Sequence, residues 1–251
     1  MSILQNAANV LRCFGTGCVD LTVTGISERL DLPKASASRL LRAMQEAGML
    51  ETIAGTRRYR PGRTMLDLAA AFRRSSGIIG LASAAVFRVS REFGHTGYVS
   101  ILDGREVTAV ADFEGTNALR VVSTIGRRHA AHQTATGRTL LSRLSVEQLA
   151  ALYPEVDAPP ALRRELAAVR SQGYALSHQE AAAGVDGIAV AVADPMTEEA
   201  VSLCIVYPHS PVSEKERDAM IAALARGAAQ IADAVGDEAF QPPKLINKVL
   251  T

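Results

Sequence analysis

The sequence predicts an α+β protein with two parts, a small helical head carrying a β-hairpin and a larger domain built on an antiparallel sheet. Two short helices joined by a tight turn and followed by a hairpin occupy residues 24–60. Alternating apolar runs between residues 96 and 113, and again between 187 and 207, are typical of antiparallel strands. With 251 residues, 48% of them hydrophobic, the chain holds enough apolar material for two cores.

The first part of the head has the signals of helix starts and stops. Ser2 is suited to cap a helix that ends at Gly15, and residues 19–23 are expected to form a short strand. Thr24 is the expected N-cap of a short second helix. Pro33 fits the first turn of the helix that follows, which ends at Gly48.

The residue pattern of the helix that starts after Pro33 predicts a DNA-binding surface. Its apolar residues form one stripe, and its small, hydroxyl and basic residues point elsewhere. Bulky side chains there would hold the backbone away from the base edges of a major groove. The residues expected to contact DNA from this helix are Lys34, Ser36, Ser38, Arg39 and Arg42.

A basic hairpin follows that helix. Residues 49–53 alternate, residues 54–56 form a turn, and a second strand returns through Tyr59. Arg57, Arg58 and Arg60 line the returning strand, where they are placed to touch backbone phosphates or enter the minor groove. The sequence therefore predicts a winged helix-turn-helix DNA-binding domain over residues 1–61.

The charge distribution agrees with a phosphate-binding head. Residues 1–65 contain nine basic and five acidic residues, whereas the rest of the chain contains 18 and 21. The same helices and hairpin also occur in protein-interaction modules, so we keep a protein-binding head as the alternative.

A linker helix over residues 62–77, a domain over 78–236 and a loosely ordered tail over 237–251 complete the expected organisation. Within the domain the expected helices cover residues 80–93, 135–144, 145–153, 160–172 and 213–235. The expected strands cover residues 96–102, 106–113, 119–124, 187–193 and 200–207.

The stretch LTVTGISERLDLPKASASRLLRAMQEAGMLE, followed by RRYRPG, resembles the IclR family of bacterial transcriptional regulators. The resemblance covers nearly the whole chain. It implies a GAF-like effector-binding domain, a linker helix that pairs subunits, and a homodimer or dimer of dimers on double-stranded operator DNA. It also implies a repressor that responds to a small-molecule effector.

The segment RRHAAHQTATGRTLLSRL is where we expect the effector. Small residues at a helix N-terminus leave backbone N–H groups free to hold a carboxylate, and here those residues are Thr134, Ala135, Thr136 and Gly137. The resemblance implies that an acidic residue, a cysteine and small polar residues of the last strand complete the pocket. The corresponding positions in this sequence are Ser177, Gly187, Cys204 and Val206.

Three of these positions depart from the family pattern. Ser177 stands where the acid is expected, Gly187 where the cysteine is expected, and Val206 is apolar. Gly187 leaves space and Val206 removes a hydrogen-bonding group. The sequence therefore favours an organic acid, lactone or aromatic catabolite over a two- or three-carbon keto acid.

Other classes of function have weaker support. His129, His132, His178 and His209 suggest a metal site or a hydrolase as an alternative, but no H-E-x-x-H or G-x-S-x-G motif is present. We expect no catalytic residue, metal or cofactor. Three cysteines form no disulfide framework, and no signal peptide or membrane span is recognisable, so we expect a cytoplasmic protein with no membrane partner.

Overall fold

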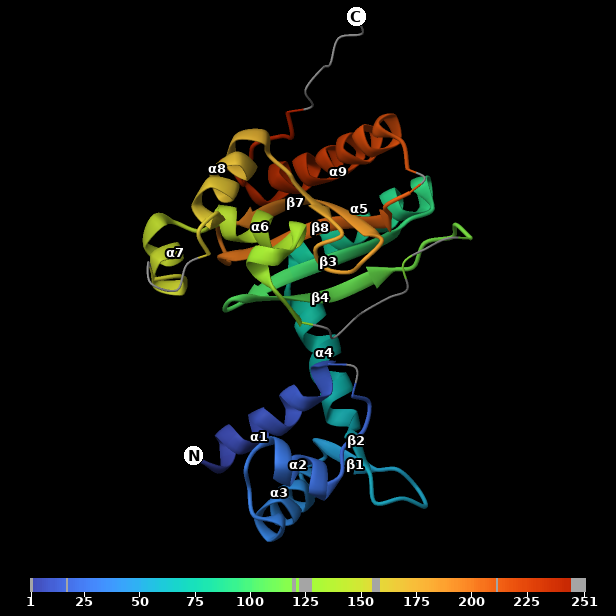
Figure 1. Cartoon of the computed structure of the whole chain (residues 1–251), viewed down its shortest axis with the longest axis vertical. Helices are drawn as coiled ribbons and strands as arrows, with labels where there is room; N and C mark the ends of the chain where they lie inside the picture. Colours follow the sequence, from blue (N-terminus) through green and yellow to red (C-terminus); the bar gives the residue numbers. More distant parts are fainter. Residues whose placement is uncertain are drawn as a thin grey trace, which may run out of the picture. The chain divides into compact units, whose positions relative to one another are not determined.

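The computed structural model describes residues 2–16, 18–118, 121, 128–154, 159–210 and 212–244. The chain divides into two compact units, Met1–Ser75 and Ser76–Thr251 (Figure 1). Each unit has its own apolar core. The predicted α+β class, with a helix-turn-helix first and an antiparallel sheet later, is confirmed. Within the described ranges no helix is long and apolar enough to cross a membrane.

The first unit is a winged helix-turn-helix followed by one more helix. Its elements are α1 (Ile3–Arg12), η1 (Cys13–Thr16), α2 (Val23–Arg29), α3 (Lys34–Glu46), β1 (Leu50–Thr52), β2 (Tyr59–Pro61) and α4 (Arg63–Ser75). Ser2 caps α1 as predicted, because its side chain accepts a hydrogen bond from the Gln5 N–H at 3.1 Å. The core of the unit gathers Val10, Ile26, Leu41 and other apolar side chains of α1, α2 and α3.

The prediction of a strand over residues 19–23 is wrong. Leu21 alone makes a bridge, to Tyr59 of the hairpin, and α2 begins at Val23. The N-cap is Thr22 and not Thr24, because the Thr22 hydroxyl accepts a hydrogen bond from the Gly25 N–H at 3.0 Å. The β-branched run that suggested a strand also contains the better cap, and the cap determines where the helix starts.

The second unit contains a six-stranded antiparallel sheet in the order β5-β4-β3-β8-β7-β6. Its strands are β3 (Thr96–Asp103), β4 (Glu106–Phe113), β5 (Arg128–Ala130), β6 (Ala175–His178), β7 (Val185–Asp194) and β8 (Glu199–Pro208). Its helices are α5 (Gly77–Phe93), η2 (Ala131–Gln133), α6 (Ala135–Arg143), α7 (Val146–Leu152), α8 (Leu162–Gln172) and α9 (Glu214–Val235).

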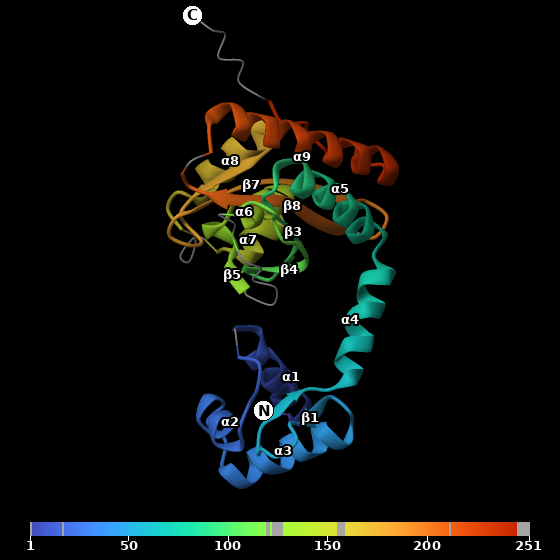
Figure 2. The same ribbon diagram turned by 90° about the vertical axis from the view of Figure 1, so that its right-hand side faces the viewer.

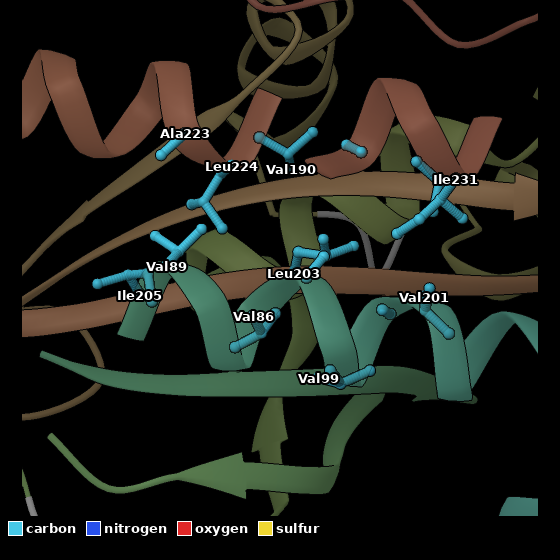
Figure 3. Packing of buried hydrophobic residues seen from close by; sticks show 14 of the residues in the cluster. Val86, Val89, Val99, Val190, Val201, Leu203, Ile205, Ala223, Leu224 and Ile231 are labelled. Atoms are coloured by element: carbon cyan, nitrogen blue, oxygen red, sulfur yellow. The ribbon is translucent and has the colours of Figure 1, made fainter. Parts of the chain in front are cut away.

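Helices cover both faces of this sheet. α5 and α9 pack together on one face (Figure 2). α6 lies on the other face, and α8 packs against α6. The main core lies between α5, α9 and the sheet, where side chains such as Val86, Leu203 and Leu224 interdigitate (Figure 3). This arrangement leaves the start of α6 facing strands from both halves of the sheet.

Two strands and one helix start differ from the sequence expectations. The short strands β5 and β6 were not predicted, because three or four residues are too few to show an alternating pattern. α5 begins at Gly77 and not at residue 80, since the Ser76 side chain accepts a hydrogen bond from the Ile79 N–H. The strand expected over residues 119–124 lies outside the described residues, apart from Val121.

The expectation of a loosely ordered tail is wrong for residues 237–244. Asp237 is buried, pairs with Arg143 of α6 and accepts a hydrogen bond from the Ala193 N–H at 2.9 Å. The Lys244 N–H donates to the Gln172 carbonyl at the end of α8 at 2.8 Å. Specific polar contacts therefore hold this segment against α6, α8 and β7 despite its two prolines. Residues 245–251 lie outside the described part of the chain.

Candidate functional site

The helix α3 separates its side chains as a DNA-reading helix requires. Its apolar residues Ala37, Leu40, Leu41 and Met44 are buried against the rest of the first unit. Lys34, Arg39 and Arg42 are exposed, and Ser36 and Ser38 are half-buried. The Arg39 guanidinium donates to the Ser36 hydroxyl at 3.3 Å. Three of the five α3 residues that were predicted to contact DNA are therefore exposed cations.

The wing arginines differ in what they contact. Arg58 pairs with Asp20, and Arg60 pairs with Glu51 across the hairpin at 2.6 Å. Arg57 is exposed and forms no ion pair among the described residues. Arg57 is therefore available to a phosphate directly, whereas Arg58 and Arg60 each have a carboxylate as a competing partner.

A cavity of about 130 Å³ lies in the second unit between the start of α6 and the sheet. Seven of the eight residues expected to bind an effector line it: Thr134, Ala135, Thr136, Ser177, Gly187, Cys204 and Val206. Tyr98, Ser100, Val107, Ala109, Val121, His129, Ala181, Ala182, Val185 and Asp186 complete the lining. The walls combine apolar surface with hydroxyl groups, which suits a small organic ligand with a polar end.

The start of α6 forms one end of the cavity. The Thr134 hydroxyl accepts a hydrogen bond from the Gly137 N–H at 2.9 Å, so this amide is already paired. The amides of Ala135 and Thr136 come first in the helix and have no intrahelical acceptor. These two N–H groups can donate to an anionic oxygen, and the helix dipole favours negative charge there.

Gly137, the eighth expected residue, does not line the cavity. A Cβ atom at this position would lie 2.0 Å from the carbonyl oxygen of Ala131. Glycine is therefore required for the close approach of α6 to the η2 segment. Gly137 therefore has a structural role, because it allows the first turn of α6 to pack closely against η2.

The opposite wall is formed by paired strands. Gly187 is in register with Ser177 on one side and Val206 on the other. A Cβ atom at Gly187 would meet Val206 at 3.5 Å and Ser177 at 3.8 Å, which is ordinary van der Waals contact. A larger side chain at this position would extend into the open volume. Burial raises the pKa of the Cys204 thiol to about 12, so Cys204 is a neutral wall residue.

The sequence reasoning missed two residues of the β3 strand, Tyr98 and Ser100. Tyr98 is in register with Cys204, a residue that was expected at the site. The pairing of β3 with β8 would have identified Tyr98, but the two strands are about a hundred residues apart in the chain, so their register cannot be read from local patterns.

Arg138 was also missed. Its side chain is almost fully buried, and it donates to Glu180 at 2.6 Å and to the Leu176 carbonyl at 2.6 Å. Glu180 precedes Ala181 and Ala182, which line the cavity. Arg138 therefore ties the segment between β6 and β7 to α6 and positions part of the cavity wall.

The four histidines considered for a metal site do not gather as that alternative requires. His178 and His209 both contact Asp186, at 3.4 and 3.0 Å from its carboxylate. His132 packs against the ring of Tyr153, and His129 lines the cavity. In the described part of the chain no three histidine, cysteine or acidic side chains are arranged to hold a metal ion.

Comparison with known proteins identifies both units. Residues 3–54 match the IclR helix-turn-helix domain, and residues 71–233 match the bacterial transcriptional regulator IclR C-terminal domain. The HTH-type transcriptional regulator XynR of Escherichia coli K12 is 32% identical over 199 residues, which are 75% of this chain and 79% of XynR.

Solved structures agree with the fold. The IclR transcriptional regulator of Alicyclobacillus acidocaldarius superposes with a TM-score of 0.80 at 23% identity, covering 92% of this chain and 97% of that protein. An IclR homologue from Microbacterium hydrocarbonoxydans, crystallised in complex with 4-hydroxybenzoate, has a TM-score of 0.75 at 23% identity and covers 94% and 99% of the two chains.

Proposed function

Because the chain belongs to the IclR family of bacterial transcriptional regulators, we propose that it is a dimeric repressor released from its operator by a small organic acid. The acid is one with a ring or a carbon skeleton of similar size. The observation that carries this proposal is the cavity in the second unit, where two helix amides without an intrahelical acceptor face an apolar wall. Repression agrees with relatives such as the acetate operon repressor of Salmonella typhimurium.

The size of the cavity supports a ligand larger than glyoxylate or pyruvate. An apolar cavity of about 150 Å³ is known to hold benzene, and the cavity here, at about 130 Å³, is of similar size. Gly187 and Val206 supply no hydrogen-bonding side chain, so a two- or three-carbon acid would leave this wall without contacts. The related Microbacterium protein, which binds 4-hydroxybenzoate, supplies a suitable probe.

The paired amides of α6 give the ligand its orientation. A carboxylate placed at Ala135 and Thr136 accepts charge-assisted hydrogen bonds from both N–H groups. The rest of the ligand then extends toward Gly187, Cys204 and Val206. This orientation makes the carboxylate necessary for affinity and the apolar wall responsible for selectivity.

Titration calorimetry with 4-hydroxybenzoate, pyruvate and glyoxylate tests the proposal. We expect 4-hydroxybenzoate to bind at least about tenfold more tightly than either keto acid, a difference of about 1.4 kcal/mol. We expect Gly187→Leu to abolish binding, because the added side chain occupies the open volume. Tight binding of glyoxylate or pyruvate without binding of the larger acid would refute the assignment of ligand size.

A matched control is Gly80→Leu on the exposed face of α5. A Cβ atom at Gly80 meets nothing within 4 Å, so this change adds the same side chain away from the cavity. Gly80→Leu should bind the acid as the parent does. If Gly187→Leu also binds normally, the ligand site lies elsewhere in the protein.

A further inference from the structure

Two serine side chains at the cavity of the second unit have no partner inside the protein. Ser100 of β3 and Ser177 of β6 both line the cavity, and the two residues are only 4% and 5% exposed. In the part of the chain that the structure describes, neither side chain forms a hydrogen bond. Buried hydroxyl groups in folded proteins almost always have a partner, so these two are candidates for contact with a ligand.

Both serines lie on the face of the sheet that α6 covers. Ser100 is in register with Ser202 of β8, and the Ser202 hydroxyl lies 2.9 Å from the Thr139 hydroxyl of α6. Residues directly opposite each other on neighbouring strands share a face, so Ser100 also faces α6. Ser177 is in register with Gly187, where a Cβ atom would lie 3.8 Å from the Ser177 Cβ atom. Both hydroxyls therefore belong to the wall opposite α6.

Several other polar groups at the cavity already have partners. The Thr136 hydroxyl donates to the Thr134 hydroxyl at 3.2 Å, and Thr134 in turn accepts from the Gly137 N–H. Asp186 also lines the cavity, but its carboxylate lies 3.0 Å from the His209 ring. A ligand that bonds to these groups competes with contacts inside the protein. The two serine hydroxyls can bond to a ligand without breaking such a contact.

We propose that Ser100 and Ser177 select an acid whose carbon skeleton carries a hydroxyl group, in preference to the same skeleton without one. This role rests on the proposed function, since it concerns a ligand of the same cavity. β8 and β7 separate β3 from β6 in the sheet, so the two serines lie three strand spacings apart, about 14 Å. A ligand of ring size with one hydroxyl group therefore reaches one serine, and the position of that hydroxyl decides which.

The selection follows from what each serine bonds to when a ligand fills the cavity. A ligand hydroxyl both donates and accepts hydrogen bonds, so it gives the serine a partner. A ligand that presents hydrocarbon at the same place leaves a buried hydroxyl unpaired, which costs free energy. Sites that hydrogen-bond a ligand hydroxyl reject analogues without it more strongly than an apolar pocket rejects an extra methylene group. We expect a preference of about tenfold for one neutral hydrogen bond.

Titration calorimetry with benzoate, 3-hydroxybenzoate and 4-hydroxybenzoate tests this role in the full-length protein. One of the hydroxylated acids should bind the parent about tenfold more tightly than benzoate does. Either Ser100→Ala or Ser177→Ala should reduce this preference to less than about twofold and leave the affinity for benzoate unchanged or higher. Retained binding of benzoate shows that the cavity of each variant is intact.

The matched control is Ser202→Ala. It removes a buried serine from the same face, next to Ser100, but Ser202 does not line the cavity, so the preference should stay at the parent value. Equal preferences in the parent, Ser100→Ala and Ser177→Ala refute the selective role of the serines, and so does a parent that binds benzoate as tightly as both hydroxylated acids. If none of the three acids binds the parent, the proposed function itself is wrong and the role of the serines fails with it.

Discussion

Arg39 and Arg42 lie on the exposed face of α3, one residue beyond the buried Leu40/Leu41 pair on either side. Neither is held by a carboxylate among the described residues, and only Arg39 has a side-chain contact, with Ser36. They can therefore reach DNA without first breaking an ion pair. This distinguishes them from Arg58 and Arg60 of the wing.

Replacing Arg39 or Arg42 by Ala should weaken DNA binding. If the arginine binds a base edge, its removal costs about 1–3 kcal/mol and relaxes sequence preference, whereas an arginine that binds a phosphate mainly sets the dependence on salt. Fluorescence anisotropy over a series of salt concentrations separates the two cases. Parent-like binding by both variants at every salt concentration would show that α3 is not the helix that reads DNA.

His95 is a buried histidine directly before β3. Its ring packs on Tyr207, and its Nε2 atom lies 3.5 Å from the Glu216 carboxylate without a well-formed hydrogen bond. Burial lowers the pKa of His95 below its ordinary value of 6.5, against the opposing effect of Glu216. The folded protein therefore holds this imidazole in its neutral form near neutral pH.

This pKa shift predicts the direction of a pH effect on stability. The unfolded chain protonates His95 first as the pH falls, so the stabilising contribution is complete above about pH 6.5 and decreases as the pH falls from there to the lower folded pKa. Chemical unfolding at about pH 7.5 and about pH 5 should show a smaller acid loss for His95→Gln than for the parent. An identical loss in both proteins would mean that His95 is not protonated on unfolding.

Among the helices and strands, those with a clear amphipathic pattern could be predicted from the sequence. The pairing of strands and the contacts between distant elements could not. α3 and β4 match their sequence expectations closely, because each has a full apolar period and clear end signals. The start of α2 was misplaced, because Thr22 and Thr24 are both good caps and only the packed structure selects one. Tyr98 and Arg138 were missed because their roles depend on strand order and on a contact between α6 and the segment after β6.

The surface of α4 exposes several large apolar side chains. Leu66, Leu68 and Phe72 are 65%, 58% and 47% exposed, an unusual number of large apolar side chains for one helix. Such a surface is stabilised when a second chain covers it. This supports the expectation that the linker helix contributes to a dimer interface.

The double variant Leu66→Glu, Phe72→Glu should convert the protein to a monomer, because charges on this surface cannot be buried without partners. Light scattering at micromolar concentration measures the change. Val146→Glu, at an apolar position of α7 that is 73% exposed, is the control and should leave the mass unchanged. A parent protein that is already monomeric would contradict the proposed assembly.

In the whole molecule, the predicted DNA-binding surface and the cavity belong to two units with separate cores. The first unit carries the cationic helix and wing, and the second carries the cavity, so we expect ligand and DNA to bind to different parts of the chain. The proposed regulation requires that the ligand bind one conformation of the protein more tightly than another, since a ligand with equal affinity for both does not shift the equilibrium between them. In the proposed dimer, we expect a two-fold operator to respond to altered spacing between the two DNA-binding units.

The most direct measurement of this coupling is the affinity for a selected DNA duplex with and without saturating 4-hydroxybenzoate, for the parent and for Gly187→Leu. We expect the acid to weaken DNA binding by the parent by about 1–3 kcal/mol, the usual range for coupled sites, and to leave Gly187→Leu bound. If the acid binds the parent in the cavity and the affinity for DNA does not change, this cavity does not control the DNA-binding unit.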